Sequence, residues 1–594
     1  MTGATPKVGV TAATAGEIHG VSGPVVVAKG LPSTRLYDVV EVGHARLTGE
    51  VIRLDGPNVV IQVYEDTSGL TAGEPVTDTR EPLRVELGPG LLGSIFDGTQ
   101  RPLTVLARAG ENPWGRPMIP RGLSAPALDR ERRWEFEPAV GVGDVVGAGD
   151  VLGTVQETAD FVHRILVQPG IAGTVTDVFR GEARIDAPVV FVDDVPLTML
   201  SRWPVRDARP TARRLGLDHP FVSGQRSIDT LFPLARGGTA TIPGGFGTGK
   251  TVLEQSLAKW AHADVIVYVA CGERGNELTE VLDEFPRLVD PRTGGSLMDR
   301  TILVANTSNM PVAAREASIY TGVTLAEYFR DQGYHVALMA DSTSRWGEAL
   351  REVSSRLEEM PAEEGYPAYL ATRLAEFYER AGAVVCLGSD ERSGSVSIVG
   401  AVSPAGGDFS EPITQHSLRL AGTFWGLDTT LARQRHFPSI NWNRSYTLYA
   451  LDDWFDREVA AGWSDQRAWA LDLLQRESSL LEIVQLLGTD SLAPAERVVL
   501  ESGRLLREDF LQQSAFDEID AYCPLPKQHA MLRVIRAAHE AMDAAIGRGV
   551  PIDALAEVGA VVREVARMRT WPEAEASERG EALIERIQRE LEEL

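Results

Sequence analysis

Cysteine is scarce in this chain. Cys271, Cys386 and Cys523 are its three cysteines among 594 residues, and no two of them form a CxxC pair. A structural zinc site needs ligands at short, fixed spacing, and a disulfide scaffold needs a dense, even set of cysteines. The sequence therefore favours a reducing compartment and a fold without structural metal.

Long apolar runs are missing as well. No stretch reaches the roughly eighteen apolar residues that a membrane-spanning helix needs. The first residues, MTGATPKVGVTAATAGE, lack the apolar core of a signal peptide. We therefore expect a soluble chain with no transmembrane segment, whose membrane role, where it has one, is peripheral.

Basic residues are in the minority. Lys and Arg number 58 against 84 Asp and Glu, which gives a formal net charge of −26. Broad nucleic-acid binding needs a basic face that displaces counterions. A nucleic-acid partner is therefore not expected.

Lysine is absent from residues 134–190, where glycine turns alternate with β-branched pairs, as in VGVGDVVGAGDVLGTV (140–155). The pattern resembles biotinyl and lipoyl carrier domains, whose function depends on a lysine that carries the prosthetic group. Without a lysine that function is excluded. The segment is predicted to be a β-rich inserted module.

The other units follow from periodicity, since a chain of this length exceeds a single core. Short strands broken by glycine predict a β-barrel. Strands that alternate with helical stretches predict an α/β domain. Apolar residues at three- and four-residue spacing predict amphipathic helices. The predicted fold is multidomain: an N-terminal β-barrel (1–85), a connecting segment (86–111), the inserted β-rich module (112–195), a P-loop, RecA-like α/β nucleotide-binding domain (196–450) and a C-terminal α-helical bundle (451–594).

One glycine-rich stretch, IPGGFGTGKT (242–251), satisfies the pattern G-x-x-x-x-G-K-[ST]. Glycines let the backbone curl so that successive N–H groups point at phosphate oxygens, the lysine neutralises the outer phosphates, and the threonine hydroxyl binds Mg²⁺. A predicted strand precedes the stretch and a predicted helix, TVLEQSLAKWAH, follows it, as an anion site at a helix N-terminus requires. The predicted nucleotide-binding residues are Gly244, Gly245, Phe246, Gly247, Thr248, Gly249, Lys250 and Thr251.

Two further predicted strands end in acids. VIVYVACGERGNEL (265–278) presents Glu273 and Arg274, and HVALMADSTSRW (335–346) presents Asp341. Ligands of open α/β sheets sit at the carboxyl ends of strands. Glu273 could there polarise a water that attacks a phosphate, and Asp341 could complete a Mg²⁺ site. A surface ion pair is the alternative for Glu273 and Arg274.

These motifs, together with SGQRSIDTLFPLARGG and HFPSINWNRSY, resemble the rotary ATPase superfamily. LGPGLLGSIFDGTQRPL (87–103) and the inserted module narrow the resemblance to the catalytic A subunits of V-type and archaeal-type (A-type) ATPases, over nearly the whole chain. The F-type catalytic β chain is shorter and lacks such an insert. The non-catalytic B chain lacks the P-loop lysine.

The resemblance implies ATP or ADP and Mg²⁺ as ligands. By position, Lys250 binds the phosphates, Thr251 and Asp341 hold Mg²⁺, Glu273 is the catalytic carboxylate, and Arg274 helps to organise the phosphate end. Many relatives have a cysteine where this chain has Thr248, so redox control through a P-loop disulfide is not expected.

The resemblance also places two regions against the adenine ring. They are Phe437 in HFPSINW and the segment LQQSAF (511–516), which includes Gln513. Ordinary core packing is the alternative for both, because aromatic side chains more often fill cores than bind ligands.

As an assembly, the resemblance implies an A3B3 hexamer around a rotating stalk, with nucleotide sites at the A–B interfaces. The B-type subunit would supply an arginine finger, and central and peripheral stalk subunits would link the ring to a membrane sector that carries H⁺ or Na⁺. The chain would lie peripherally on the cytoplasmic side of that membrane. The sequence does not say whether ATP is made or split.

Three other functions share parts of this pattern. Export ATPases of secretion systems and flagella share the core, but they are shorter and lack the insert. An RNA-translocating hexamer of the Rho type does not fit the net charge of −26. A non-catalytic ring subunit would have no need of Glu273.

Overall fold

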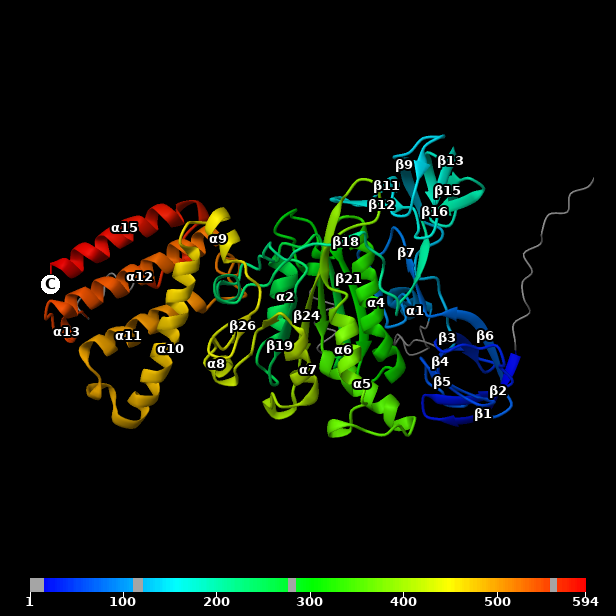
Figure 1. Cartoon of the computed structure of the whole chain (residues 1–594), viewed down its shortest axis with the longest axis horizontal. Coiled ribbons are helices and arrows are strands. Elements are labelled where there is room, and N and C mark those ends of the chain that lie inside the picture. Colours follow the sequence, from blue (N-terminus) through cyan, green and yellow to red (C-terminus); the bar gives the residue numbers. More distant parts are fainter. Residues whose placement is uncertain (1–14, 110–120, 276–284, 556–563, 594) are drawn as a thin grey trace, which may run out of the picture.

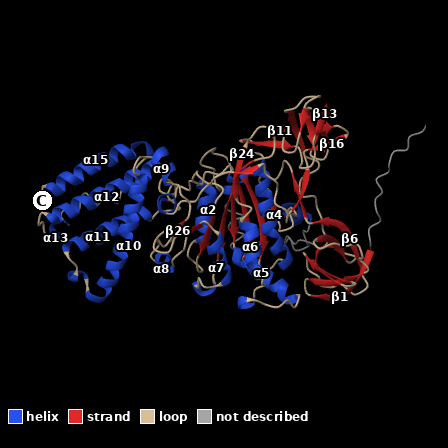
Figure 2. Ribbon diagram, in the orientation of Figure 1, coloured by secondary structure: helices blue, strands red, loops and turns tan. Residues whose placement is uncertain are grey.

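The structure, a computed structural model, describes residues 15–109, 121–275, 285–555 and 564–593. Figure 1 shows a β-barrel at one end, a layered α/β domain in the middle and a helical domain at the other end, with a β-rich module projecting beside the middle domain. Figure 2 shows the change from strands to helices along this axis. The predicted multidomain fold is confirmed. Within the described ranges, no helix combines the length and apolar character that crossing a membrane requires.

The N-terminal part is a closed antiparallel barrel with strand order β1-β2-β5-β4-β3-β6. Alternate side chains enter its core: in β3, Val40 and Val42 are buried and Val39 and Glu41 are half-buried. Branched residues favour such a pleated surface. The strands are β1 (Ala15–Ser22), β2 (Val25–Lys29), β3 (Asp38–Val42), β4 (Leu47–Asp55), β5 (Asn58–Val63) and β6 (Pro75–Pro82).

The segment between barrel and module takes part in larger sheets. β7 (Arg84–Leu87) pairs antiparallel with β17 (Ser201–Pro204), the strand that follows the module. β8 (Ile95–Phe96) pairs parallel with β21 (Thr301–Thr307) at one edge of the central sheet, and α1 (Leu103–Ala109) comes next. The connection is therefore part of the core rather than a linker.

The inserted module consists of two four-stranded sheets, ordered β10-β13-β15-β16 and β12-β11-β9-β14. Its glycine turns are closed by aspartates: Asp144 Oδ2 accepts the Gly141 N–H at 2.8 Å, and Asp150 Oδ2 accepts the Gly147 N–H at 2.7 Å. The strands are β9 (Arg133–Pro138), β10 (Val145–Val146), β11 (Val151–Thr158), β12 (Phe161–Leu166), β13 (Gly173–Val178), β14 (Gly181–Arg184), β15 (Pro188–Val192) and β16 (Val195–Thr198).

The module is docked on the middle domain through buried contacts. His163 bonds Glu157 Oε2 through Nδ1 at 2.5 Å and the Tyr328 hydroxyl through Nε2 at 2.7 Å. The Phe161 ring lies 5.6 Å from the Phe329 ring, centroid to centroid. The module therefore shares a core with the nucleotide-binding domain.

The middle domain is built on a ten-stranded sheet with the order β26-β25-β19-β24-β22-β20-β21-β8, to which β18 and β23 attach. Strands β19, β24, β22, β20 and β21 are parallel, so their carboxyl ends share one edge. The strands not yet bounded are β18 (Arg213–Arg214), β19 (Thr239–Pro243), β20 (Val265–Glu273), β22 (His335–Asp341), β23 (Gly382–Val385), β24 (Ser393–Val402), β25 (Thr423–Phe424) and β26 (Tyr446–Thr447). The helices are α2 (Lys250–Trp260), α4 (Val312–Asp331), α5 (Thr343–Arg356), α6 (Leu370–Tyr378), α7 (Pro412–Leu420) and α8 (Thr429–Arg433).

The C-terminal part is helical, as its periodicity predicts. One buried apolar cluster runs from the sheet, where it includes Ile242 and Tyr268, into the helices, where it includes Leu473, Ile535 and Ile587. The helical domain is therefore packed onto the nucleotide-binding domain. Its helices are α9 (Asp452–Glu458), α10 (Trp463–Leu487), α11 (Pro494–Leu505), α12 (Leu525–Gly547), α13 (Ile552–Leu555) and α15 (Glu573–Glu592).

A half-buried arginine joins the barrel to the middle domain. Arg206 Nη2 donates to Glu50 Oε2 in β4 at 2.7 Å and to Glu316 Oε2 in α4 at 3.0 Å. Its guanidinium lies 4.9 and 4.8 Å from the ring centroids of Tyr37 and Tyr320. One cation thus pairs with two carboxylates from different domains.

Replacing this cation should destabilise the domain junction. We expect Arg206→Gln to cost about 3–5 kcal/mol of unfolding free energy, because two carboxylates then stay buried without a counter-charge. Urea unfolding followed by tryptophan fluorescence measures the effect. Arg46→Gln, which breaks the exposed pair with Glu41, is the matched control and should leave the midpoint unchanged. Equal midpoints for the two variants would contradict the assignment.

Candidate active site

The P-loop connects β19 to α2, and its glycines have the backbone that the turn requires. Gly247 and Gly249 have φ of 75° and 86°, in the left-handed region that side chains disfavour. A Cβ on Gly244 would lie 2.5 Å from Thr248 Oγ1 and 2.8 Å from Leu427 Cβ. The loop therefore excludes side chains at these positions. The predicted strand, loop and helix follow one another as the motif requires.

Polar contacts hold the loop in shape. Lys250 Nζ donates to the carbonyl oxygens of Gly244 at 2.6 Å and Gly245 at 2.9 Å. Thr248 Oγ1 also donates to Gly245 O, at 2.8 Å. From outside the loop, Ser439 Oγ donates to Thr248 O at 2.6 Å. Ser439 is a supporting residue that the motif does not reveal, because it lies 191 positions away in the sequence.

The predicted Mg²⁺ ligands lie together. Thr251 Oγ1 donates to Asp341 Oδ2 at 3.2 Å, and the buried Tyr268 hydroxyl donates to the same oxygen at 3.2 Å. Asp341 ends β22 and Glu273 ends the neighbouring parallel strand β20. A hydroxyl and a carboxylate at one point, beside the P-loop, are the hard oxygen ligands that Mg²⁺ prefers.

A further acid, Glu254, lies inside this cluster. Burial raises the pKa of its carboxyl well above the usual range, the carboxylates of Asp341 and Glu273 raise it further, and Lys250 lowers it. The Glu254 carboxyl therefore holds a proton more readily than an ordinary glutamate does. Glu254 was not identified from the sequence. An acidic residue on the apolar side of the helix TVLEQSLAKW was the signal that could have revealed it.

Arg274 lies at the rim of the loop. Its Cζ lies 5.2 Å from the centroid of the Phe246 ring, and Phe246 is 82% exposed. The structure therefore brings two predicted residues together on the solvent side of the P-loop. Their roles toward a phosphate stay predictions.

The two predicted adenine contacts are neighbours. Phe437 O accepts the Gln513 backbone N–H at 2.6 Å. The Gln513 side chain is buried: Oε1 accepts the Arg226 N–H at 2.7 Å, and Nε2 donates to Gly224 O at 3.0 Å and Asp520 O at 2.9 Å. The bonds to Gly224 and Arg226 link the C-terminal segment to the nucleotide-binding domain, and the bond to Asp520 lies within that segment.

Within the same segment, Phe516 is 90% exposed. An exposed ring is the part of this segment that can stack on a base without breaking a contact. The adenine roles of Phe437 and Gln513 stay predictions. Both N–H groups of the Gln513 side-chain amide already donate within the protein.

Four family models match successive parts of the chain. The β-barrel domain of the ATP synthase alpha/beta family matches residues 18–80, and its nucleotide-binding domain matches 224–447. The barrel-sandwich domain of the alpha/beta subunits matches residues 125–206, and the C-terminal domain of V and A type ATP synthase matches 452–555.

Similar proteins cover nearly the whole chain. It is 59% identical over 557 residues to one A subunit of the A-type ATP synthase of Methanospirillum hungatei, covering 93% of this chain and 94% of that one. It is 55% identical to the A subunit of the A-type ATP synthase of Methanopyrus kandleri, over 98% of each, and 55% identical to the V-type ATP synthase alpha chain of Thermoanaerobacter pseudethanolicus, over 93% and 94%. The chain belongs to the A subunits of the A- and V-type ATP synthases.

This membership confirms the resemblance inferred from the motifs. A solved structure of the ATPase EscN from the type III secretion system of enteropathogenic E. coli aligns with a TM-score of 0.62 at 23% identity, covering 88% of this chain and 99% of that one. At that identity the likeness shows a shared fold alone. The A-subunit interpretation is therefore favoured over the export ATPase.

Ser439 offers a test of how this protein shapes its P-loop. We expect Ser439→Ala to weaken Mg-ADP binding about three- to tenfold, the value of one hydrogen bond, because Thr248 O loses its donor. Isothermal titration of the full chain measures it. Ser479→Ala removes an exposed hydroxyl that bonds Gln475 O in α10 and should bind as the wild type does. Unchanged affinity in Ser439→Ala would show that the bond does not support the loop.

Proposed function

We propose that this chain carries the catalytic site of a rotary ATPase that couples ATP hydrolysis or synthesis to H⁺ or Na⁺ transport. The observation that supports this most is the meeting of Lys250, Thr251, Glu273 and Asp341 at one edge of a parallel sheet. The family membership indicates the class of reaction, which is hydrolysis or synthesis of ATP. The contribution of each residue follows from its position at that edge.

The phosphates bind at the start of α2. Backbone N–H groups of the loop and the positive end of the helix attract anions there. The Lys250 ammonium, which lies against loop carbonyls 2.6 and 2.9 Å away, is within reach of phosphates that enter the loop. Its charge stabilises the outer phosphates in the ground state and in the transition state.

The residues present fit a magnesium ion. Thr251 and Asp341 would hold it, and no larger set is needed, because Mg²⁺ keeps several waters and takes further oxygens from the nucleotide. When bound, the ion neutralises charge between the outer phosphates. The pKa of the buried Glu254 carboxyl in this cluster is raised, chiefly by burial, which disfavours a further negative charge there. Asp341 keeps its position through the hydroxyls of Thr251 and Tyr268.

Glu273 supplies the carboxylate that orients and polarises the attacking water. It is half-buried at the end of β20, one strand from Asp341, so it can reach a water on the far side of the terminal phosphate. Removal of its charge should therefore affect the chemical step more than binding.

The Glu273 role is tested by a substitution that keeps its shape. We expect Glu273→Gln to keep nucleotide affinity within a few-fold and to lower phosphate release by at least about 10²-fold, the scale of positioned acid–base catalysis. Both are measured on the ring assembled with the B-type partner. Glu182→Gln, an exposed acid in the module, should retain full activity. Normal turnover by the Glu273→Gln variant would show that the carboxylate has no role in the chemical step.

An arginine from a neighbouring B-type chain would complete the site. In the family the finger comes from that partner, and Arg274 is assigned to the phosphate end of this chain instead. Central and peripheral stalk subunits would link the ring to a membrane sector, and the chain would lie peripherally on the cytoplasmic side of that membrane.

The need for the partner is tested by separating the chains. We expect the isolated chain to bind Mg-ATP but to hydrolyse it about 10³-fold more slowly than the ring, since arginine fingers contribute on that order. Steady-state phosphate release on a monomer verified by gel filtration, before and after addition of the B-type chain, measures it. Fast turnover by the monomer would contradict a finger in trans.

A further inference from the structure

A cavity of about 210 Å³ lies where the inserted module meets the nucleotide-binding domain. Residues 165–169 at the end of β12 and 198–204 around β17 form one wall, and Arg209 and Tyr328 form the other. Arg84, Arg202 and Arg209 line it, and no acidic side chain of the described residues does. Each of these arginines pairs with an acid outside the lining: Arg84 with Glu81, Arg202 with Glu86 and Arg209 with Asp331.

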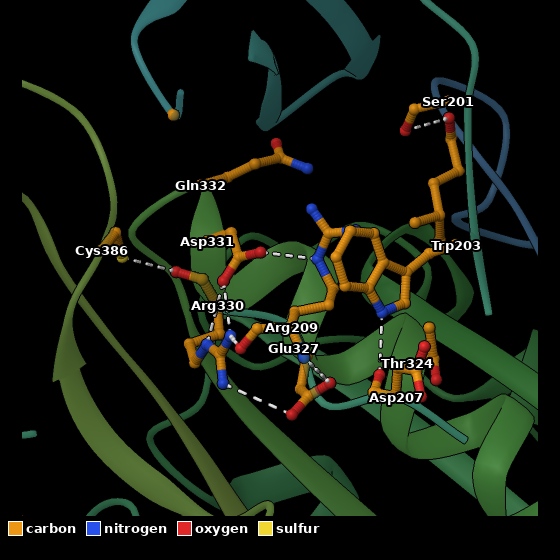
Figure 3. Close-up of polar contacts among 12 residues, drawn as sticks. Ser201, Trp203, Asp207, Arg209, Thr324, Glu327, Arg330, Asp331, Gln332 and Cys386 are labelled. Atoms are coloured by element: carbon orange, nitrogen blue, oxygen red, sulfur yellow. Dashed lines mark hydrogen bonds and ion pairs between the residues drawn. The ribbon is translucent and has the colours of Figure 1, made fainter. Parts of the chain in front are cut away.

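Arg209 is the central residue of this cavity. Its side chain is 7% exposed, and Nε donates to Asp331 Oδ2 at 2.6 Å. The guanidinium lies 4.8 Å from the centroid of the Trp203 ring, whose Nε1 is fixed by a 2.8 Å bond to Asp207 O. Neither Nη atom has a hydrogen-bond acceptor within the described part of the chain. Figure 3 shows a terminal nitrogen that points away from Asp331, toward the side of Gln332 and Ser201.

The charges behind Arg209 do not balance. Three buried guanidiniums, of Arg209, Arg330 and Arg380, face two buried carboxylates, of Glu327 and Asp331. Figure 3 labels all of these residues except Arg380. Asp331 is shared, because its Oδ1 accepts from Arg330 at 2.6 Å while its Oδ2 accepts from Arg209. One positive charge therefore remains in excess, and burial makes such an excess costly.

The negative end of helix α4 does not supply the missing charge. Its last carbonyl oxygens already accept from other arginines: Asp331 O from Arg392 Nε at 2.8 Å, and Gln332 O from Arg164 Nη1 at 2.7 Å. Of the further acids, Glu81 and Glu86 pair with the rim arginines Arg84 and Arg202 at 3.7 and 3.1 Å, and Glu157 is separated from the cavity by His163 and Tyr328. It accepts the N–H groups of Gly90 and Leu92 and bonds His163, on the far side of Tyr328.

We propose that this cavity binds a small oxyanion, a phosphate or carboxylate group, with Arg209 as its anchor. The two free Nη atoms of a guanidinium match the paired oxygens of either group. Arg84 and Arg202 stand at the more exposed rim, where each would have to share its guanidinium between the anion and its partner Glu81 or Glu86. Ile165 and Met199 would cover a small apolar body. The volume lies below the roughly 300 Å³ of sites for drug-sized ligands, which excludes a nucleotide.

Direct titration tests the site on the full chain with the P-loop saturated by Mg-ADP. Inorganic phosphate, glycerol phosphate and succinate are titrated by calorimetry, with glycerol as the uncharged control. At least one anion should bind saturably with a Kd of about 1 mM or below, and glycerol should not. Which anions bind separates phosphate from carboxylate ligands. Failure of all three anions overturns the proposal.

Variants locate the binding. Arg84→Gln with Arg202→Gln changes two rim residues whose side chains are 37% and 57% exposed, and should weaken binding of the anion at least about fivefold. Arg184→Gln, an exposed arginine of the module outside this cavity, should leave it unchanged. The anion should also raise the thermal midpoint of the wild type and the Arg184 variant, and raise that of the double variant less. Equal affinity for the anion in the double variant and the wild type would overturn the proposal that the anion binds in this cavity.

Discussion

Parallel pairing of the central strands is the constraint on which the active site depends. β19 lies beside β24, β24 beside β22, and β22 beside β20, all with the same direction. Asp341 therefore lies in register with Ala270, three residues before Glu273. Lys250 follows directly on β19 and its loop. Residues spread over about ninety sequence positions meet at one edge, because parallel strands present their carboxyl ends together.

Helix α4 is the frame that the other domains share. Near its start, Glu316 receives Arg206, which also bonds Glu50 of the barrel. Near its end, Tyr328 receives His163 of the module. Arg206 is half-buried and the other groups are buried, where a missing partner is costly. Barrel, module and sheet are therefore fixed to one helix, and the module is a docked part of the domain rather than an appendage.

The features that could be predicted from the sequence are those that a short stretch of residues determines. The P-loop, the acid at each strand end and the change from strand to helix periodicity all lie within short windows. Ser439 could not be predicted in the same way, because its bond to Thr248 spans 191 positions. Gln513 was assigned to the ligand from its place in the chain, yet its amide is occupied by Gly224, Arg226 and Asp520. Such roles depend on tertiary partners that no periodicity reveals.

These long-range bonds form a continuous path from the P-loop to the helical domain. Thr248 O is held by Ser439, two residues beyond Phe437, and Phe437 O accepts the Gln513 N–H. Gln513 bonds Arg226, whose Nη1 reaches Asp520 at 2.7 Å. The steps are hydrogen bonds, except for the covalent chain from Ser439 to Phe437, and a stretched bond would leave a polar atom unpaired. A displacement of the P-loop that keeps these bonds must therefore be passed on to Gln513 and Asp520 of the C-terminal part.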